Sequence, residues 1–201
     1  MTLPSWYKIR EIDFIHFKKL LQPIYNILEK KNTHIHSKDP FLQNIWSQYY
    51  NTNFLSDYQN TQSIRSLSMV LGHLHENIIA CFPNWEKIYR HKTKCDIIGY
   101  NGRIVVEIKN NVNTMNSDSK RSVLMKLHSH IIEKNGNKAF LVIINNCKKP
   151  KQILDNGIVI YSGETFYHII SNRVDFFNDL LYTLTYIFSN YKTFNQLMTE
   201  T

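Results

Sequence analysis

Residues 96–109, DIIGYNGRIVVEIK, contain two short apolar runs on either side of Asn101-Gly102. Asn-Gly between β-branched runs predicts a hairpin with a type I′ turn, because both central residues of that turn need a positive φ. A two-residue loop at Asn101-Gly102 also fixes the strand register. It pairs Gly99 with Ile104 and, at the open end of the hairpin, Asp96 with Glu107.

This register brings three charged side chains together. Directly opposed residues have Cβ atoms roughly 4.5–5.5 Å apart on one face of a sheet. Two carboxylates at that separation repel each other unless a cation lies between them. Lys109 follows Glu107 by two residues, so the strand period puts it on the same face. The hairpin therefore predicts a patch of Asp96, Glu107 and Lys109 on otherwise apolar strands.

Such a patch is suited to metal-dependent hydrolysis. Asp96 and Glu107 offer hard oxygen ligands for Mg²⁺, with Mn²⁺ as a substitute, and the backbone carbonyl of Ile108 could add a third oxygen. A divalent ion held there activates water and offsets transition-state charge, and Lys109 could orient or deprotonate that water. Phosphodiester hydrolysis uses all these parts. The alternative is a structural cluster at a sheet edge. A second Glu-x-Lys, at Glu29, is interpreted as a solvated charge run.

Composition restricts the class of protein. The 201 residues suit one domain, and 24 Lys+Arg against 16 Asp+Glu give a formal charge of +8. That charge favours polyanions such as nucleic acid, although a basic soluble protein without such a partner is the simpler alternative. No apolar run approaches the ~18–20 residues of a spanning helix, and a secretory signal is not supported. Three scattered cysteines without a CxxC indicate reduced thiols. We expect a cytoplasmic protein that is not secreted and has no membrane partner.

The N-terminal third is predicted to be helical. Residues 11–31 carry a helical stripe in which Pro23 either kinks the helix or starts a second one. A short helix is predicted at 40–50 and a polar loop at 51–61. Residues 61–81 are predicted to form a long helix, because apolar residues recur at spacings of three and four.

Strands and helices alternate in the remainder of the chain. Strands are predicted at 85–90, 95–100, 103–109, 139–144 and 157–161, and helices at 119–134, 162–171 and 173–190. A basic loop is predicted at 147–155. In the helix at 119–134, Val123 and Leu127 are expected to face the core, with Lys126 and His130 on the other side. This order predicts an α/β fold with a mixed central sheet flanked by helices on both faces.

Three motifs in this chain resemble a known family. They are Gly72-His73-Leu74-His75-Glu76-Asn77 in the long helix, Glu107-Ile108-Lys109-Asn110 in the third strand, and Asn113-Thr114-Met115-Asn116-Ser117 after it. They are similar to type II restriction endonucleases of the PD-(D/E)xK superfamily, in the branch that cleaves GGNCC-like sites. The resemblance implies a restriction-endonuclease-like αβββαβ core, Mg²⁺ on Asp96 and Glu107, and Lys109 assisting the attacking water. Cys95 stands where the superfamily's name has proline.

The resemblance also implies a substrate, an assembly and a division of the chain. It implies double-stranded DNA cut at a short palindrome, possibly of the GG..CC type, by a homodimer that leaves 5′-phosphate ends and needs no small-molecule cofactor. We expect a single endonuclease domain with a helical extension at 1–60, a catalytic core at 61–161 and C-terminal helices at 162–201. The alternatives are a structure-specific or repair nuclease of the same fold, and a catalytically inactive DNA-binding protein.

Other candidate residues have weaker assignments. His75 and Asn77 match the family helix and could support the site, although the preferred interpretation of His75 is a core histidine bonded to the backbone. Glu76 stands where that branch has glutamine, and it could be an auxiliary metal ligand. However, helical periodicity predicts that Glu76 is exposed. A phosphate- and base-contacting surface is expected after the catalytic strand, unless its residues serve only as loop and cap: Asn110, Asn113, Thr114, Asn116, Ser117, Ser119, Lys120 and Arg121.

Overall fold

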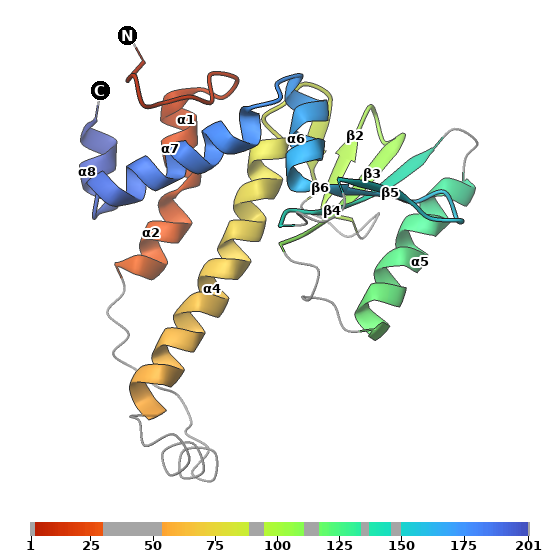
Figure 1. The fold of residues 1–201 in the computed structure, drawn as a ribbon, viewed down its shortest axis with the longest axis horizontal. Helices are drawn as coiled ribbons and strands as arrows, with labels where there is room; N and C mark the ends of the chain where they lie inside the picture. The colour runs from red at the N-terminus through yellow and green to blue at the C-terminus, as the bar shows by residue number, and fades with distance from the viewer. Residues whose placement is uncertain are drawn as a thin grey trace.

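A six-stranded mixed sheet forms the centre of the protein (Figure 1). In this computed structural model the residues described are 3–29, 54–88, 95–110, 117–133, 137–145 and 150–200; for 54–64 only the backbone is described. The strands are β1 (Trp85–Lys87), β2 (Ile97–Gly99), β3 (Ile104–Lys109), β4 (Lys138–Ile143), β5 (Lys151–Ile153) and β6 (Val159–Ser162). The helices are α1 (Phe14–Leu20), α2 (Gln22–Leu28), α4 (Phe54–Ile79), α5 (Ser117–Glu133), α6 (Gly163–Ser171), α7 (Phe176–Asn190) and α8 (Phe194–Thr199).

The strand order is β1-β2-β3-β4-β6-β5. The first three strands are antiparallel, β3, β4 and β6 are parallel, and β5 returns antiparallel to β6. Helix α5 connects β3 to β4, as a parallel pair requires. β4 is buried along almost its whole length because it lies between two parallel neighbours and is covered on both faces. The predicted mixed α/β sheet with helices on both faces is confirmed.

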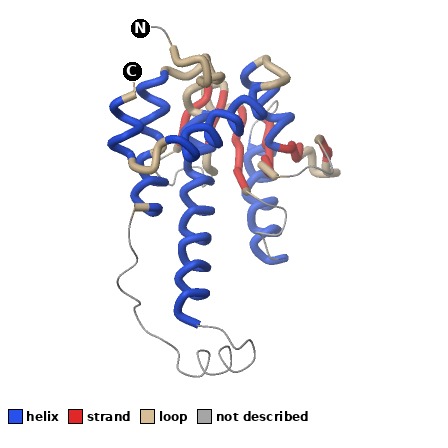
Figure 2. Tube along the Cα trace, turned by 60° about the vertical axis from the view of Figure 1, so that its left-hand side comes forward, coloured by secondary structure: helices blue, strands red, loops and turns tan. Residues whose placement is uncertain are grey.

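Two hydrophobic clusters lie on opposite faces of the sheet. One contains Val105, Leu141 and Ile143 from the strands with Val123 and Leu127 from α5. The other contains the alternate strand residues and the apolar sides of α1, α2, α4, α6 and α7. Figure 2 shows α4 and α5 as two helices that both project past the sheet on the same side.

The N-terminal segment packs against the C-terminal helices. Trp6 stacks on Tyr186 of α7 with ring centroids 4.8 Å apart. The buried Lys18 ammonium donates a hydrogen bond to the carbonyl of Glu200 at 2.6 Å. Residues far apart in sequence therefore build one helical layer, in which both chain ends lie near each other (Figure 1).

Most predicted elements are present, with shifted boundaries. The region 11–31 divides where Pro23 occupies the first turn of α2, so the proline starts a second helix as one of the two expectations allowed. The predicted helix at 40–50 lies outside the described residues. The predicted loop at 51–61 is wrong from Phe54 onward, where α4 begins, and its residues 51–53 lie outside the described residues. Its polar residues have low helix propensity, but propensity is a weak preference once a helix can propagate from a packed segment.

The predicted basic loop at 147–155 is also wrong in part. Lys151–Ile153 forms β5, the outermost strand of the sheet, and its three residues are exposed. Charged and polar residues are common on edge strands, where they discourage pairing with other chains, so the sequence resembles a loop. No helix in the described part of the chain is long and apolar enough to cross a membrane.

Candidate active site

The Asn-Gly hairpin has the predicted register. Gly99 lies opposite Ile104, and Ile97 lies opposite Val106. The φ angles of Asn101 and Gly102 are positive, 57° and 79°, as predicted, but Tyr100 also has a positive φ of 52°, so the loop between the paired Gly99 and Ile104 covers residues 100–103 rather than two residues. The N–H of Asp96 donates to the carbonyl of Val106 at 3.1 Å, one residue before the Glu107 that the predicted register would place there, so the direct opposition of Asp96 and Glu107 stays a prediction.

The carboxylates of Asp96 and Glu107 have different hydrogen-bond partners in this hairpin. The Asp96 Oδ2 accepts a hydrogen bond from the backbone N–H of Ile108 at 2.7 Å. Glu107 is only 5% exposed, and its Oε1 accepts a hydrogen bond from the Lys109 ammonium at 2.8 Å. The strand period therefore places Lys109 beside Glu107, as predicted.

Burial and repulsion from Glu107 disfavour the ionised form of the Asp96 carboxyl. Burial, followed by the charge of Glu107, raises the pKa of Asp96 from 3.8 to about 6. The Ile108 N–H and the Lys109 ammonium act in the opposite direction but do not cancel these effects. A cation between the two carboxylates would relieve this repulsion.

The backbone of Ile108 contributes to the same point. Its N–H points toward Asp96, and the N–H and carbonyl of one strand residue point to the same side of the strand. The Ile108 carbonyl is therefore directed toward the strand that carries Asp96. The neighbouring Lys109 carbonyl instead accepts from the Ile144 N–H, on the β4 side, at 2.8 Å.

Lys126 is a fourth member of this cluster, and the sequence assigned it to the wrong side of α5. Its ammonium lies 3.5 Å from Oε2 of Glu107, with the lysine side chain 28% exposed. Lys126 and His130 are both half-buried rather than turned away from the sheet. The signal was in the spacing, because Val123, Lys126, Leu127 and His130 follow the i, i+3, i+4, i+7 pattern of one helix face.

A groove of about 510 Å³, lined by apolar and polar residues in equal number, adjoins Asp96 on the α4 side; we call it the polar groove after its charged residues. Glu76, Asn77 and Lys87 line it together with Asp96. The predicted exposure of Glu76 is wrong: its side chain is 13% exposed and pairs with the Lys87 ammonium at 2.9 Å. The helix alone presents Glu76 to solvent, but β1 packs beside α4 and supplies this partner. Lys87 also donates to Oδ1 of Asn77 at 2.8 Å, so Asn77 lies in the same groove.

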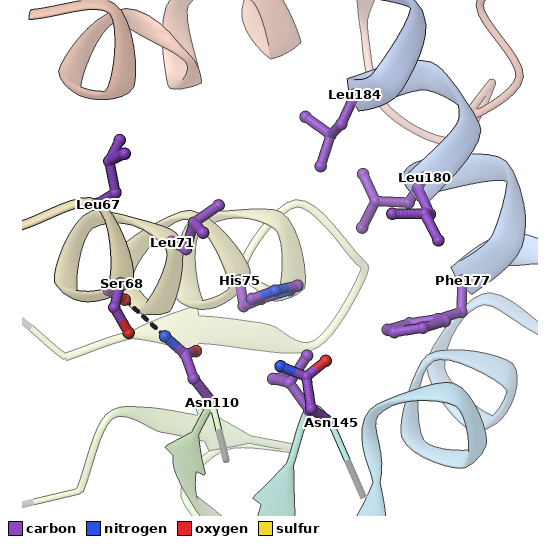
Figure 3. Close-up of a pocket in the computed structure, with 11 residues that line it drawn as sticks. Leu67, Ser68, Leu71, His75, Asn110, Asn145, Phe177, Leu180 and Leu184 are labelled. Atoms are coloured by element: carbon purple, nitrogen blue, oxygen red, sulfur yellow. Dashed lines mark hydrogen bonds between the residues drawn. The ribbon is translucent and has the colours of Figure 1, made fainter. Parts of the chain in front are cut away.

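His75 and Asn110 lie apart from the carboxylates, in an apolar pocket of about 390 Å³ between α4 and α7 (Figure 3). Nδ1 of His75 is 2.9 Å from the Tyr167 hydroxyl, and burial lowers its pKa to about 4. The expected core histidine therefore bonds to a side chain rather than to the backbone. Asn110 donates to the Ser68 carbonyl, as the dashed line in Figure 3 shows. Neither side chain is brought to the predicted trio.

The remaining predicted DNA contacts divide into two groups. Asn113, Thr114 and Asn116 lie outside the described residues. Four others form the exposed first turns of α5, and three of these line a shallow groove of about 370 Å³: Ser117, Lys120 and Arg121. Helix α5 begins at Ser117 rather than at the predicted residue 119, so Ser119 lies inside its first turn. The structure thus separates this basic helix end from Asn110.

The donor set fits a hard divalent ion held partly by water. In the described residues, no group of three or more His, Cys, Asp or Glu gathers as a ready-made metal cage. The hairpin offers two carboxylates and one directed carbonyl, and Oε2 of Glu107 is buried without a hydrogen-bond partner. Mg²⁺ typically binds one or two carboxylates and keeps several waters, so this sparse set suits it.

Comparison with known families identifies a match over most of the chain. The family described as Eco47II restriction endonuclease matches residues 12–192, which is most of the chain. A comparison with curated proteins gives no match. The matched range includes all six strands of the sheet, the hairpin, α5 and the residues of the polar groove.

Proposed function

Because the chain belongs to the Eco47II restriction endonuclease family, a type II restriction endonuclease family, we propose that it is a Mg²⁺-dependent enzyme that cuts double-stranded DNA at a short palindrome through the Asp96–Glu107–Lys109 site. Two hydrogen bonds carry this proposal: the Ile108 N–H fixes one oxygen of Asp96, and the Lys109 ammonium is held against Glu107 on the neighbouring strand. GG..CC is the sequence type that the motif resemblance favours.

Each residue has a distinct task in this proposal. Asp96, Glu107 and the carbonyl of Ile108 hold the ion, which supplies Lewis-acid stabilisation of charge on the phosphate and a more acidic water. Lys109 orients the attacking water as a hydrogen-bond donor; to accept that water's proton, its ammonium would first have to release one of its own to solvent, which a nearby cation favours. Glu76 lies across the polar groove from this set and is an auxiliary ligand only if its pairing with Lys87 is broken.

Substrate binding is assigned to α5 and the segment before it. The exposed Lys120 and Arg121 contact phosphates, and arginine can also read guanine in the major groove. A palindromic site implies a homodimer with one active site for each strand. Mn²⁺ is expected to replace Mg²⁺, and the products are expected to carry 5′-phosphate and 3′-hydroxyl ends.

Digestion of a sequenced plasmid tests the proposal. The wild-type protein with Mg²⁺ should cut at discrete sites, and end mapping should give the sequence and the 5′-phosphate. Glu107→Ala and Lys109→Ala should reduce cleavage at least about a thousandfold while DNA binding, measured in Ca²⁺ by fluorescence anisotropy, persists. Glu133→Ala, at the exposed end of α5, is the matched control and should cut normally.

Three results would contradict the proposal. Cleavage at the wild-type rate by either site variant would show that the site is misassigned. Cutting of branched DNA alone would indicate a structure-specific nuclease. Binding without any cleavage by the wild-type protein would indicate an inactive DNA-binding protein. Analytical ultracentrifugation of the free and DNA-bound protein tests the homodimer.

A further inference from the structure

We propose that Lys126 is a positioning residue that competes with the metal ion for Oε2 of Glu107 in the DNA-free protein and turns to the DNA phosphate once the ion is bound. This inference rests on the proposed function, because it assumes that Glu107 is a metal ligand. It concerns a lysine on α5 that belongs to none of the motifs by which the sequence resembles its family.

The first support is the sharing of one carboxylate between two ammonium groups. Lys109 is 2.8 Å from Oε1 of Glu107, and Lys126 is 3.5 Å from Oε2. Glu107 is 6% exposed in its side chain, so water contributes little to balancing its charge. A divalent ion that bound the Glu107 carboxylate through Oε2 would therefore have to displace the Lys126 ammonium or be repelled by it.

The second support is the long contact between Lys126 and Oε2 of Glu107, together with the flexibility of a lysine side chain. Oε2 is buried and has no hydrogen-bond partner, so the contact with Lys126 is an ion pair without good hydrogen-bond geometry. The Lys126 side chain is 28% exposed, and a lysine has a flexible four-carbon stem. Its ammonium can therefore leave Glu107 without unfolding α5.

The third support is the position of Lys126 along α5. Lys120 and Arg121 lie about one to two turns before it, at the exposed start of the helix. A phosphate backbone held by these residues could pass near the ammonium that the ion displaces. Lys126 would then couple the two binding events, because the cost of displacing it falls when a phosphate is present to receive it.

Metal binding to the DNA-free protein tests this role. Loss of one positive charge a few ångströms from the ion should tighten Mn²⁺ binding about tenfold, even in a water-like dielectric. Lys126→Met and Lys126→Gln should both show this gain by titration calorimetry, and both should cleave DNA about tenfold more slowly in single turnover. The glutamine retains a hydrogen-bond donor for Oε2 without the charge, so it guards against misfolding of the methionine variant.

Lys138→Met is the matched control. Lys138 is exposed at the start of β4, opposite Ile104 and therefore at the far end of the strand pair from Lys109, so the same charge change there should leave Mn²⁺ affinity unchanged. In thermal unfolding, both Lys126 variants should gain more stability from Mn²⁺ than the wild type and the control do. A merely structural lysine would not produce this pattern.

The outcomes separate this inference from the proposed function. If the wild-type protein binds Mn²⁺ and cuts DNA, but both Lys126 variants bind Mn²⁺ within twofold of it or more weakly, the inference is wrong and the nuclease assignment stands. If the wild-type protein neither binds Mn²⁺ nor cuts DNA, both fall together.

Discussion

Asp96→Asn is expected to stabilise the metal-free protein while it destroys the active site. The pKa of Asp96 rises from 3.8 to about 6 on folding, so the ionised carboxylate is less favourable in the folded than in the unfolded state. Because the pKa of this carboxyl is higher in the folded state, the unfolding free energy decreases as pH increases from the unfolded pKa through the folded pKa. Each pKa unit corresponds to ~1.4 kcal/mol, which gives up to about 3 kcal/mol above pH 7.

The assay is urea unfolding in EDTA at two pH values. Asparagine still accepts the Ile108 N–H but carries no charge, so Asp96→Asn should be up to about 3 kcal/mol more stable than wild type at pH 8 and about half that at pH 5. Asp155→Asn, at an exposed position, should change neither value by more than about 0.5 kcal/mol.

Metal binding should narrow the difference in unfolding free energy between the wild type and Asp96→Asn. An ion that binds the folded wild type at tenfold excess over its Kd adds about 1.4 kcal/mol, whereas the variant should gain little. Cleavage by Asp96→Asn should be undetectable under the same conditions. The reasoning is refuted if the variant is no more stable than wild type at pH 8 in EDTA, or if its advantage is the same at both pH values.

Three further predictions address other parts of the molecule. His75→Gln should reduce the acid sensitivity of the protein, because burial lowers the pKa of His75 from 6.5 to about 4. In the wild type, protonation of His75 in the unfolded state lowers the unfolding free energy by up to about 3 kcal/mol as pH falls from 6.5 through 4. Urea unfolding at several pH values would measure this loss and its absence in the variant. Gly99→Ala should cost about 1–3 kcal/mol in unfolding free energy, because a Cβ there would lie 2.7 Å from the Trp85 ring; an unchanged urea midpoint would contradict it. Lys120→Ala with Arg121→Ala should lower the salt dependence of DNA binding by about two ions, as read from log Kd against log salt, and an unchanged slope would exclude these phosphate contacts.

The hairpin is the part of the protein that its sequence specifies most completely. Asn101-Gly102 determines the turn through positive φ, and the turn determines the register. The position of Lys109 beside Glu107 then follows from the two-residue period of a strand. All of these are local effects, so no knowledge of distant residues is needed to predict them.

The alternation of apolar segments likewise predicts the layers of the fold. Errors occur where a local pattern is overridden from outside. Polar residues from Phe54 onward join α4 despite low helix propensity, and Lys151–Ile153 becomes an edge strand only because β6 offers it a partner. Hydrophobic periodicity reports which side of an element is apolar, but it does not report what packs against the polar side.

The sequence by itself determined the αβββαβ order, the hairpin register and the trio of Asp96, Glu107 and Lys109. Only the tertiary structure decided which further charges meet that trio. Lys126 reaches Glu107 from α5, and Lys87 of β1 pairs with Glu76 beside Asp96. These contacts join elements far apart in the chain, and side-chain partners across such distances depend on how helices pack on the sheet rather than on spacing within any one element.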